Sequence, residues 1–411
     1  MADIIPFKGI LYDVTKVQME DVLAPPYDII TPEYREALYM QSPYNIVRID
    51  FGKEESSDNE ARNKYTRARE YLDAWLKEGV FIRSEKPSFY AYEMSYRINS
   101  IRKRLLGFLG LVKLEELGKG SVYPHECTHS KPKQDRLNLM RSCNAHTSPI
   151  FSLYKTTNGR IANILAKVSM AKPYIEATDI SGDVHRIWQI DDEEEIEHIK
   201  HELKDKSVFI ADGHHRYETA FELYRERSSP EMSASAKPYD HVLMFLSNML
   251  DEGLTILPTH RLLKTIPEDM DSILARYFEI ETVAGDFDIR KILSGKRLAF
   301  GFFRRGSTSW QILTYRDANV SEIDHHLREI DVIILHELVL KMISDTAEIG
   351  YEMDVRRALD RVNNGEFSAA FFLNPTRVED VEKAALSFVR MPPKSTYFYP
   401  KLLTGLVINK W

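Results

Sequence analysis

An abrupt change of pattern at residues 208–227 marks the most informative stretch of the chain. Four consecutive apolar residues, 208–211, end at Asp212 and Gly213. Apolar residues then recur at positions 217, 220, 221 and 224, the spacing of one helix face. The pattern predicts a buried strand, a glycine turn and a helix. Two histidines and an arginine stand at the start of that helix.

Comparable patterns predict elements along the rest of the first 263 residues. A polar turn precedes a helix from about residue 59 to residue 77, with Gly79 at its C-terminal stop. Residues 88–98 and 102–117 are predicted to be neighbouring strands joined by 99–101, and residues 177–190 a further hairpin. Residues 191–206 predict an acidic helix that ends in lysines, an order that suits the helix dipole.

After Leu263 the pattern changes. Residues 266–316 predict helix, strand, helix and hairpin with few catalytic residue types, which indicates a smaller and mostly structural module. Helices return from Ile330, and residues 391–406 lack periodicity. Alternating helices and strands predict a mixed α/β (α+β) protein. We expect a catalytic α/β region at 1–265 and a C-terminal α/β region at 266–411, whose final loop, 391–405, returns to the active site.

Composition narrows the class of protein. Of 411 residues, 43% are hydrophobic and 28% charged, which is typical of a soluble globular chain. A net charge of −7 and a pI of about 6.0 argue against nucleic acid as the main partner. Two cysteines favour a reducing cytoplasm. Neither a signal peptide nor an 18-residue apolar run is visible, so we expect a cytoplasmic protein that does not bind membranes.

The run Asp212, Gly213, His214, His215, Arg216 predicts an anion site. The first turn of a helix presents backbone N–H groups and a positive dipole end, which favour bound phosphate. Cations there oppose the dipole, so their placement makes sense if a polyanion compensates them. Asp212 suits an N-cap, a metal ligand or a proton partner. The alternatives are an N-cap beside a surface histidine pair, and a transition-metal site.

A second constellation lies in the stretch "YPHECTHSKPKQDRLNLMRS", 123–142. Two prolines predict that most of it is loop before a helix starts near Asp135. Lysine and arginine suit phosphate, whereas Glu126 and Asp135 suit proton acceptance. A charged surface loop is the alternative. The candidates are His125, Glu126, Thr128, His129, Lys131, Lys133, Asp135 and Arg136.

Three weaker stretches complete the set. His260 and Arg261 end a predicted strand, Lys394 lies in the proline-rich stretch 391–405, and Asp28 follows the pair Pro25-Pro26. Neither a Walker phosphate loop nor a GxGxxG turn is present, which argues against the ordinary ATP and dinucleotide folds.

Ordered motifs across nearly the whole chain resemble the DUF1015 family. They include "LAPPYD", "NIVRID", "HECT", "KQDRLNL", "ADGHHRYETA", "FFLNPT" and "PPKSTYFYPKLLTGL". The DGHHR core is also similar to a motif of free serine kinases, which have a ParB/sulfiredoxin-like domain and phosphorylate the hydroxyl of free L-serine. ADP is the donor in the archaeal kinases, and we associate inorganic pyrophosphate with the DUF1015 family. The resemblance implies that Asp212, His214, His215 and Arg216 contact the donor's phosphates or the transferred group.

These residues and the resemblance lead to one hypothesis, a phosphotransferase with L-serine as acceptor and pyrophosphate or a nucleotide as donor. Glu126 would be the base, with Asp28 and Asp135 as alternatives, and it would face one pocket with His214. Mg²⁺ is expected on the donor oxygens and Asp212. The phosphate ligands would be Gly213, Arg216, Lys133, Arg136, His125, Arg261 and Lys394, and the substrate contacts Asp28, Thr128 and His260. A phosphate-ester or nucleotide hydrolase and a ParB-like nucleotide-binding regulator are the rivals.

Overall fold

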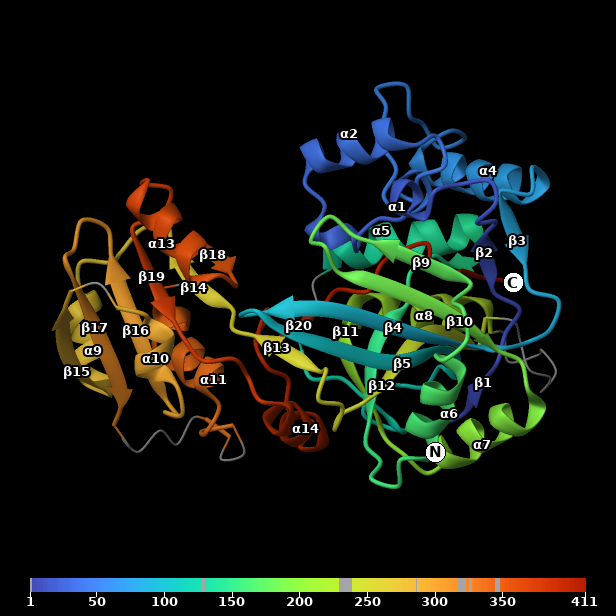
Figure 1. The fold of residues 1–411 in the computed structure, drawn as a ribbon. Coiled ribbons are helices and arrows are strands. Elements are labelled where there is room, and N and C mark those ends of the chain that lie inside the picture. Colours follow the sequence, from blue (N-terminus) through green and yellow to red (C-terminus); the bar gives the residue numbers. More distant parts are fainter. Residues whose placement is uncertain are drawn as a thin grey trace. The chain divides into compact units, whose positions relative to one another are not determined.

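The computed structural model describes residues 2–126, 130–228, 239–285, 287–316, 323–324, 327–343 and 348–411, with the side chains of 130–132 excepted. The chain divides into two compact units. Unit 1 comprises Met1–Pro124, Thr128–Thr255 and Pro400–Trp411, and unit 2 comprises His125–Cys127 and Ile256–Tyr399. The chain therefore leaves unit 1 and later returns to it. Figure 1 shows both units.

Unit 1 is built on a nine-stranded mixed sheet with the strand order β6-β11-β8-β12-β5-β4-β10-β9, and β1 pairs with β5. The pairs β11–β6 and β12–β8 are parallel, with the antiparallel pair β11–β8 between them, and the other pairs are antiparallel. The strands are β1 (Ile4–Ile5), β4 (Phe89–Ile98), β5 (Ile101–Lys113), β6 (Val122–Tyr123), β8 (Ile150–Tyr154), β9 (Ile175–Thr178), β10 (Val184–Ile190), β11 (Val208–Asp212) and β12 (His241–Asn248). Strand β11 of this sheet ends at Asp212, so the DGHHR turn begins at the end of a sheet strand.

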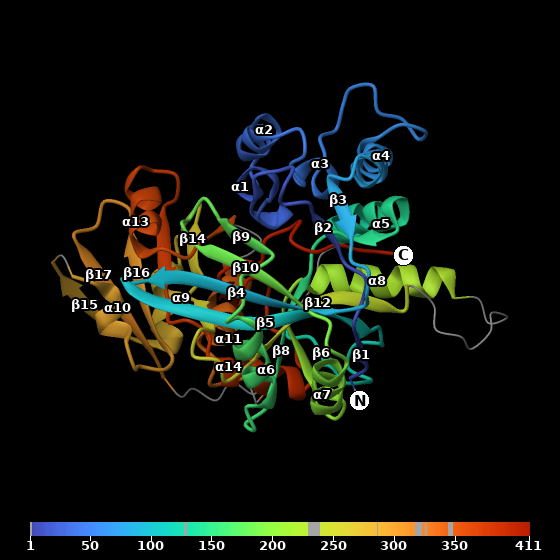
Figure 2. The ribbon, with the colours of Figure 1, turned by 45° about the vertical axis from the view of Figure 1, so that its right-hand side comes forward.

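The long β4–β5 hairpin confirms the two predicted neighbouring strands (Figure 2). Asn99 and Ser100 form its two-residue turn with φ of 49° and 68°. Positive φ at both turn residues matches the right-handed twist of the flanking strands, which is why such turns dominate tight hairpins. The hairpin that β9 and β10 form confirms the prediction for 177–190.

Helices pack against this sheet, with α5 and α8 side by side (Figure 2). The predicted helix at 59–77 begins five residues later, because Asn63 caps it with a capping box. Asp192 caps the acidic helix. The helices are α1 (Met19–Val22), the 3₁₀ turn η1 (Tyr27–Ile29), α2 (Pro32–Gln41), α3 (Val47–Asp50), α4 (Lys64–Lys77), α5 (Ser130–Cys143), α6 (Arg160–Val168), α7 (Glu193–Leu203) and α8 (His214–Arg227).

Unit 1 also contains two two-stranded sheets. Strands β2 (Ile10–Tyr12) and β3 (Phe81–Arg83) form one, and β7 (Ala145–His146) with β21 (Asn409–Lys410) forms the other. The segment 400–411 also pairs with the N-terminal part of the unit, through bridges that join Ile408 to Ile10 and Thr404 to Ala24. This returning segment is thus an integral part of unit 1.

Unit 2 contains a six-stranded sheet with the order β15-β17-β16-β19-β14-β18. The predicted helix, strand, helix and hairpin are confirmed as α9 (Met270–Tyr277), β15 (Phe278–Ala284), α10 (Ile289–Leu293), β16 (Ala299–Arg304) and β17 (Ser309–Tyr315). The other elements are β13 (Thr255–Leu257), β14 (His260–Leu263), α11 (Asp331–Leu335), the π-helical turn η2 (His336–Leu340), α12 (Lys341–Ile343), β18 (Ile349–Glu352), α13 (Val355–Asn363), β19 (Ala369–Phe372), α14 (Val378–Leu386) and β20 (Tyr397–Tyr399).

Two boundary predictions were wrong. Helix α5 begins at Ser130 rather than near Asp135, with Pro132 inside its first turn. Proline is tolerated there because the N–H groups of the first turn have no partner within the helix. His260 and Arg261 begin strand β14 instead of ending a strand. Within the described ranges, no helix combines the length and the apolar character that crossing a membrane requires.

Candidate anion-binding and catalytic residues

Gly213 forms the junction between β11 and α8. It is the N-cap of α8, with left-handed φ and ψ of 96° and 27° and no side-chain cap. The N-cap is therefore Gly213 and not Asp212, which is the last residue of β11. A Cβ atom at this glycine would lie 2.9 Å from Nη2 and 3.0 Å from Nε of Arg216. Both the backbone conformation and the close approach of the guanidinium require glycine.

Arg216 is buried and folds back toward the start of its helix. Its Nη1 donates a hydrogen bond to the Pro149 carbonyl, and its Nη2 lies 3.6 Å from Oδ2 of Asp212. Lys401, from the returning segment, places its Nζ 3.4 Å from the same Oδ2. Two cations therefore share one carboxylate at the helix N-terminus, so the local charge is positive where the helix dipole is also positive.

His214 is buried at the first position of α8, whereas His215 is half-buried. The hydroxyl of Thr219 donates a hydrogen bond to the His215 carbonyl at 2.6 Å. Lys133, on α5, forms an ion pair with Glu218 of α8. This ion pair joins α5 to α8 and engages Lys133 with a carboxylate of the neighbouring helix.

Tyr27 links the LAPPYD motif to two arginines of the predicted site. The Arg136 guanidinium stacks over its ring, with 4.1 Å between Cζ and the ring centroid. Burial raises the pKa of the Tyr27 phenol to about 12, although the positive charges of Arg136 and Arg216 oppose that rise. The phenol therefore stays protonated at neutral pH. Asp28, next in the chain, is exposed.

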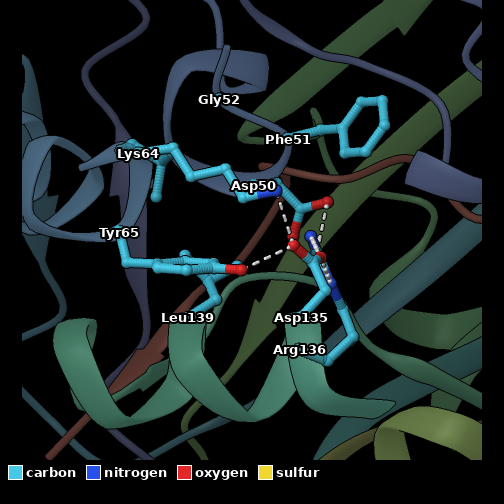
Figure 3. Close-up of a pocket in the computed structure, with 9 residues that line it drawn as sticks. Asp50, Phe51, Gly52, Lys64, Tyr65, Asp135, Arg136 and Leu139 are labelled. Atoms are coloured by element: carbon cyan, nitrogen blue, oxygen red, sulfur yellow. Dashed lines mark hydrogen bonds and ion pairs between the residues drawn. The ribbon is translucent and has the colours of Figure 1, made fainter. Parts of the chain in front are cut away.

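Arg136 is buried in the network that Figure 3 shows. Its Nε donates to Oδ2 of Asp135 at 3.0 Å, and its Nη1 lies 3.4 Å from Oδ2 of Asp50. Asp135 also accepts from Lys64 Nζ at 2.8 Å and from the Tyr65 hydroxyl at 3.0 Å. Burial opposes ionisation of Asp135, but Arg136 and Lys64 hold its pKa at about 2. A carboxyl group with so low a pKa is a weak proton acceptor at neutral pH.

A second cluster of predicted residues lies in unit 2. His125 is fully buried, with its Nε2 2.9 Å from the Thr396 hydroxyl. The backbone N–H of Lys394 donates to Oε1 of Glu126 at 2.6 Å, and Arg390 Nη1 donates to the Glu126 carbonyl at 3.0 Å. The HECT segment and the 391–396 loop are therefore neighbours within this unit.

Strand β14 adds two buried side chains to the same unit. Arg261 donates from Nη2 to the Lys394 carbonyl at 3.0 Å and from Nη1 to the Thr259 carbonyl. Burial lowers the pKa of Arg261 to about 10, so it remains charged at neutral pH. His260 packs against the Phe372 ring, and burial lowers its pKa to about 3. A neutral, buried His260 suits a core position.

The predicted residues thus fall into two groups. Asp212, Gly213, His214, His215, Arg216, Lys133, Arg136 and Asp28 belong to unit 1, and His125, Glu126, His260, Arg261 and Lys394 belong to unit 2. Thr128 lies outside the described residues. The shared pocket of Glu126 and His214 therefore stays a prediction. Sequence reasoning did not assign Tyr27 or Asp50 to the site, although each lies in a motif that it singled out. The lysines of 391–405, Lys401 among them, suited anion binding, but only Lys394 was named as a phosphate ligand.

The described residues contain no group of three or more histidine, cysteine, aspartate or glutamate side chains that could hold a metal ion. The magnesium expected here would need only one or two carboxylates beside the oxygens of the donor. Asp212 is already close to two cations, which oppose a bound divalent ion. Magnesium binding by Asp212 therefore stays a prediction.

Comparison with known proteins identifies relatives. A family model described as "Protein of unknown function (DUF1015)" matches residues 4–333. No curated protein matches the chain. Similar solved structures include a free serine kinase in complex with AMP, with 12% identity, a TM-score of 0.38 and coverage of 69% of this chain and 92% of that chain.

Two further structures are similar. A conserved hypothetical protein from Pyrococcus furiosus has 14% identity, a TM-score of 0.37 and coverage of 69% of this chain and 89% of that one. SbnI with a C-terminal truncation, from Staphylococcus aureus, has 10% identity, a TM-score of 0.39 and coverage of 72% and 85%.

Proposed function

This chain belongs to the DUF1015 family, and we propose that it is a phosphotransferase that phosphorylates the hydroxyl of free L-serine. The donor is inorganic pyrophosphate or a nucleotide such as ADP or ATP. One observation carries the proposal: Arg216 and Lys401 flank Asp212 at the N-terminus of the 14-residue helix α8. Helix N–H groups and two cations together suit a polyphosphate. The acceptor rests on the resemblance of the DGHHR motif to free serine kinases, and we take unit 1 as an elaborated ParB/sulfiredoxin-like core.

The reaction transfers one phosphoryl group. The serine Oγ attacks the terminal phosphorus of the donor, so that an Oγ–P bond forms while the bond from phosphorus to the bridging oxygen breaks. The leaving group is orthophosphate when the donor is pyrophosphate. The proton of the serine hydroxyl goes to a carboxylate, for which Glu126 is our candidate. Catalysis of this kind depends on positioning and on neutralising charge more than on covalent chemistry.

We assign the phosphate contacts in unit 1 to the first turn of α8, with His214, His215, Arg216 and Lys401. Arg136 is better suited to holding Tyr27, because its guanidinium is buried between Asp135 and Asp50 and stacks on that ring. Lys133 and, in unit 2, His125, Arg261 and Lys394 are predicted ligands of the leaving phosphate. For Arg261 and Lys394 the contacts support a different role.

A donor screen tests the proposal. Full-length protein is incubated with L-serine and pyrophosphate, ADP or ATP in turn, and O-phosphoserine and orthophosphate are quantified. We expect phosphoserine in proportion to donor consumed, and about 10²–10⁴-fold lower turnover in Glu126→Gln. Orthophosphate without phosphoserine would identify a hydrolase. Affinity for duplex DNA at physiological salt without turnover would favour the ParB-like regulator.

A further inference from the structure

We infer that Arg261 and Lys394 are positioning residues, which orient the Glu126 carboxylate through the backbone of the loop 391–396 instead of binding phosphate with their charges. The inference rests on the proposed function, because it takes Glu126 as the proton acceptor. All residues concerned belong to unit 2.

The Glu126 carboxylate is held by a backbone group. The Lys394 N–H donates to its Oε1 at 2.6 Å, a short bond of the charge-assisted kind. Lys394 has a φ of 60°, in the left-handed region that non-glycine residues seldom occupy. A strained residue persists only where its surroundings enforce it. The loop is therefore held in the conformation that aims this N–H at the carboxylate.

Arg261, on strand β14, holds Lys394 in this conformation. Its Nη2 donates to the Lys394 carbonyl at 3.0 Å, so one residue is bound at its C=O by Arg261 while its N–H binds Glu126. The other hydrogen bond of the guanidinium goes to the Thr259 carbonyl. The side chain is 2% exposed, and Tyr351 lies beneath it with 5.6 Å between Cζ and the ring centroid. A guanidinium enclosed in this way serves the backbone and not a diffusible anion.

The backbone of His125 and Glu126 is held by two further hydrogen bonds, from residues 390 and 391. Arg390 Nη1 donates to the Glu126 carbonyl at 3.0 Å, and the Met391 N–H donates to the His125 carbonyl at 2.7 Å. The backbone of Glu126 is therefore attached to the start of the loop, and its carboxylate to the middle. Loss of Arg261 would leave the first attachment intact and loosen the second.

Three variants distinguish a positioning role of Arg261 and Lys394 from phosphate binding by their side-chain charges. Arg261→Met removes the donors at similar length, and Arg261→Lys keeps a charge without the fork. Lys394→Gly removes the side chain but keeps the N–H, so it tests whether the side-chain charge binds the donor. Arg290→Met removes an exposed guanidinium of the same unit that pairs with Asp288, and it is the matched control. We expect Arg261→Met to lower kcat at least about tenfold with the donor KM unchanged, Lys394→Gly to leave the donor KM unchanged, and Arg290→Met to keep kcat and KM within about twofold of wild type. In a Glu126→Gln background the effect of Arg261→Met should disappear, because residues that act as one unit are not additive.

Amide hydrogen exchange of the peptide that contains 391–396 provides a readout that does not need activity. We expect faster exchange in both Arg261→Met and Arg261→Lys, because both lose the planar fork that binds the Lys394 carbonyl. Unchanged exchange, an additive double variant, or a raised donor KM in Lys394→Gly would each overturn the inference. If wild type forms no phosphoserine, the proposed function fails while exchange still decides the positioning claim. If wild type forms phosphoserine and Arg261→Met equals it, only the inference fails.

Discussion

Replacement of Gly213 by alanine tests the proposed anion site most directly, because the chain contains a matched control. Gly159 is also a helix N-cap in the left-handed region, with φ of 67°, and a Cβ there would meet nothing within 4 Å. Left-handed backbone costs a residue with a Cβ about 1–2 kcal/mol. Gly159→Ala and Gly213→Ala should therefore share that loss of stability.

Only Gly213→Ala should also affect ligand binding. Its new Cβ would come within 3.1 Å of three guanidinium atoms of Arg216. Arg216 cannot move away without lengthening its 3.6 Å contact to Asp212 or its bond to the Pro149 carbonyl. A hydrogen bond to a charged group contributes about 1.5–3 kcal/mol, so we expect pyrophosphate affinity to fall at least about tenfold.

The assay pairs thermal unfolding with calorimetric titration of pyrophosphate. Both variants should unfold at lower temperature, by roughly 2 °C for each kcal/mol in a unit of this size. Wild type and Gly159→Ala should bind pyrophosphate alike. Equal affinity in all three proteins, or an equal loss in both variants, would refute the role assigned to the α8 N-terminus.

Three further predictions concern unit 1. Arg136→Met should cost about 3–5 kcal/mol, because it leaves the buried Asp50 carboxylate without its cation. Arg141→Met, which breaks an exposed pair, should cost about 0–1 kcal/mol in denaturant unfolding. The pKa of Asp135 is about 2 in the folded protein and about 3.9 in the unfolded chain, so the ionised carboxylate adds to the free energy of unfolding. This contribution is present above about pH 4 and is lost as the pH falls through about 2. Asp135→Asn should therefore flatten this acid range of the stability–pH curve. Arg216→Lys should raise the donor KM in steady-state assays, since the planar fork is lost, and unchanged kinetics would contradict that role.

Local structure was largely readable from the chain. The apolar run 208–211 and the glycine after it predicted β11 and the start of α8, because burial and backbone freedom act over few residues. The errors in the helix and strand boundaries arise from local effects that the apolar pattern does not report. Pro132 marked a loop in the sequence, yet the first turn of a helix accepts proline.

Long-range pairing was not readable. Glu126 meets the Lys394 backbone across 268 positions, and Lys401 meets Asp212 across 189 positions (401 − 212). Both contacts depend on sheet topology, which no periodicity encodes. The charges of Arg136 and Arg261 suggested phosphate ligands, because composition shows a charge without showing that Asp135 or a carbonyl already binds it.

The return of the chain to unit 1 has a consequence for biosynthesis. Between Thr255 and Pro400 the ribosome must add 145 residues (400 − 255). At about 5–20 residues per second this takes roughly 7–30 s. During that interval strand β7 lacks β21, Ala24 lacks its partner Thr404, and Asp212 lacks Lys401. A nascent chain therefore lacks these partners of β7, Ala24 and Asp212 until residues 400–411 emerge, so the proposed anion site is completed only after unit 2 has been synthesised.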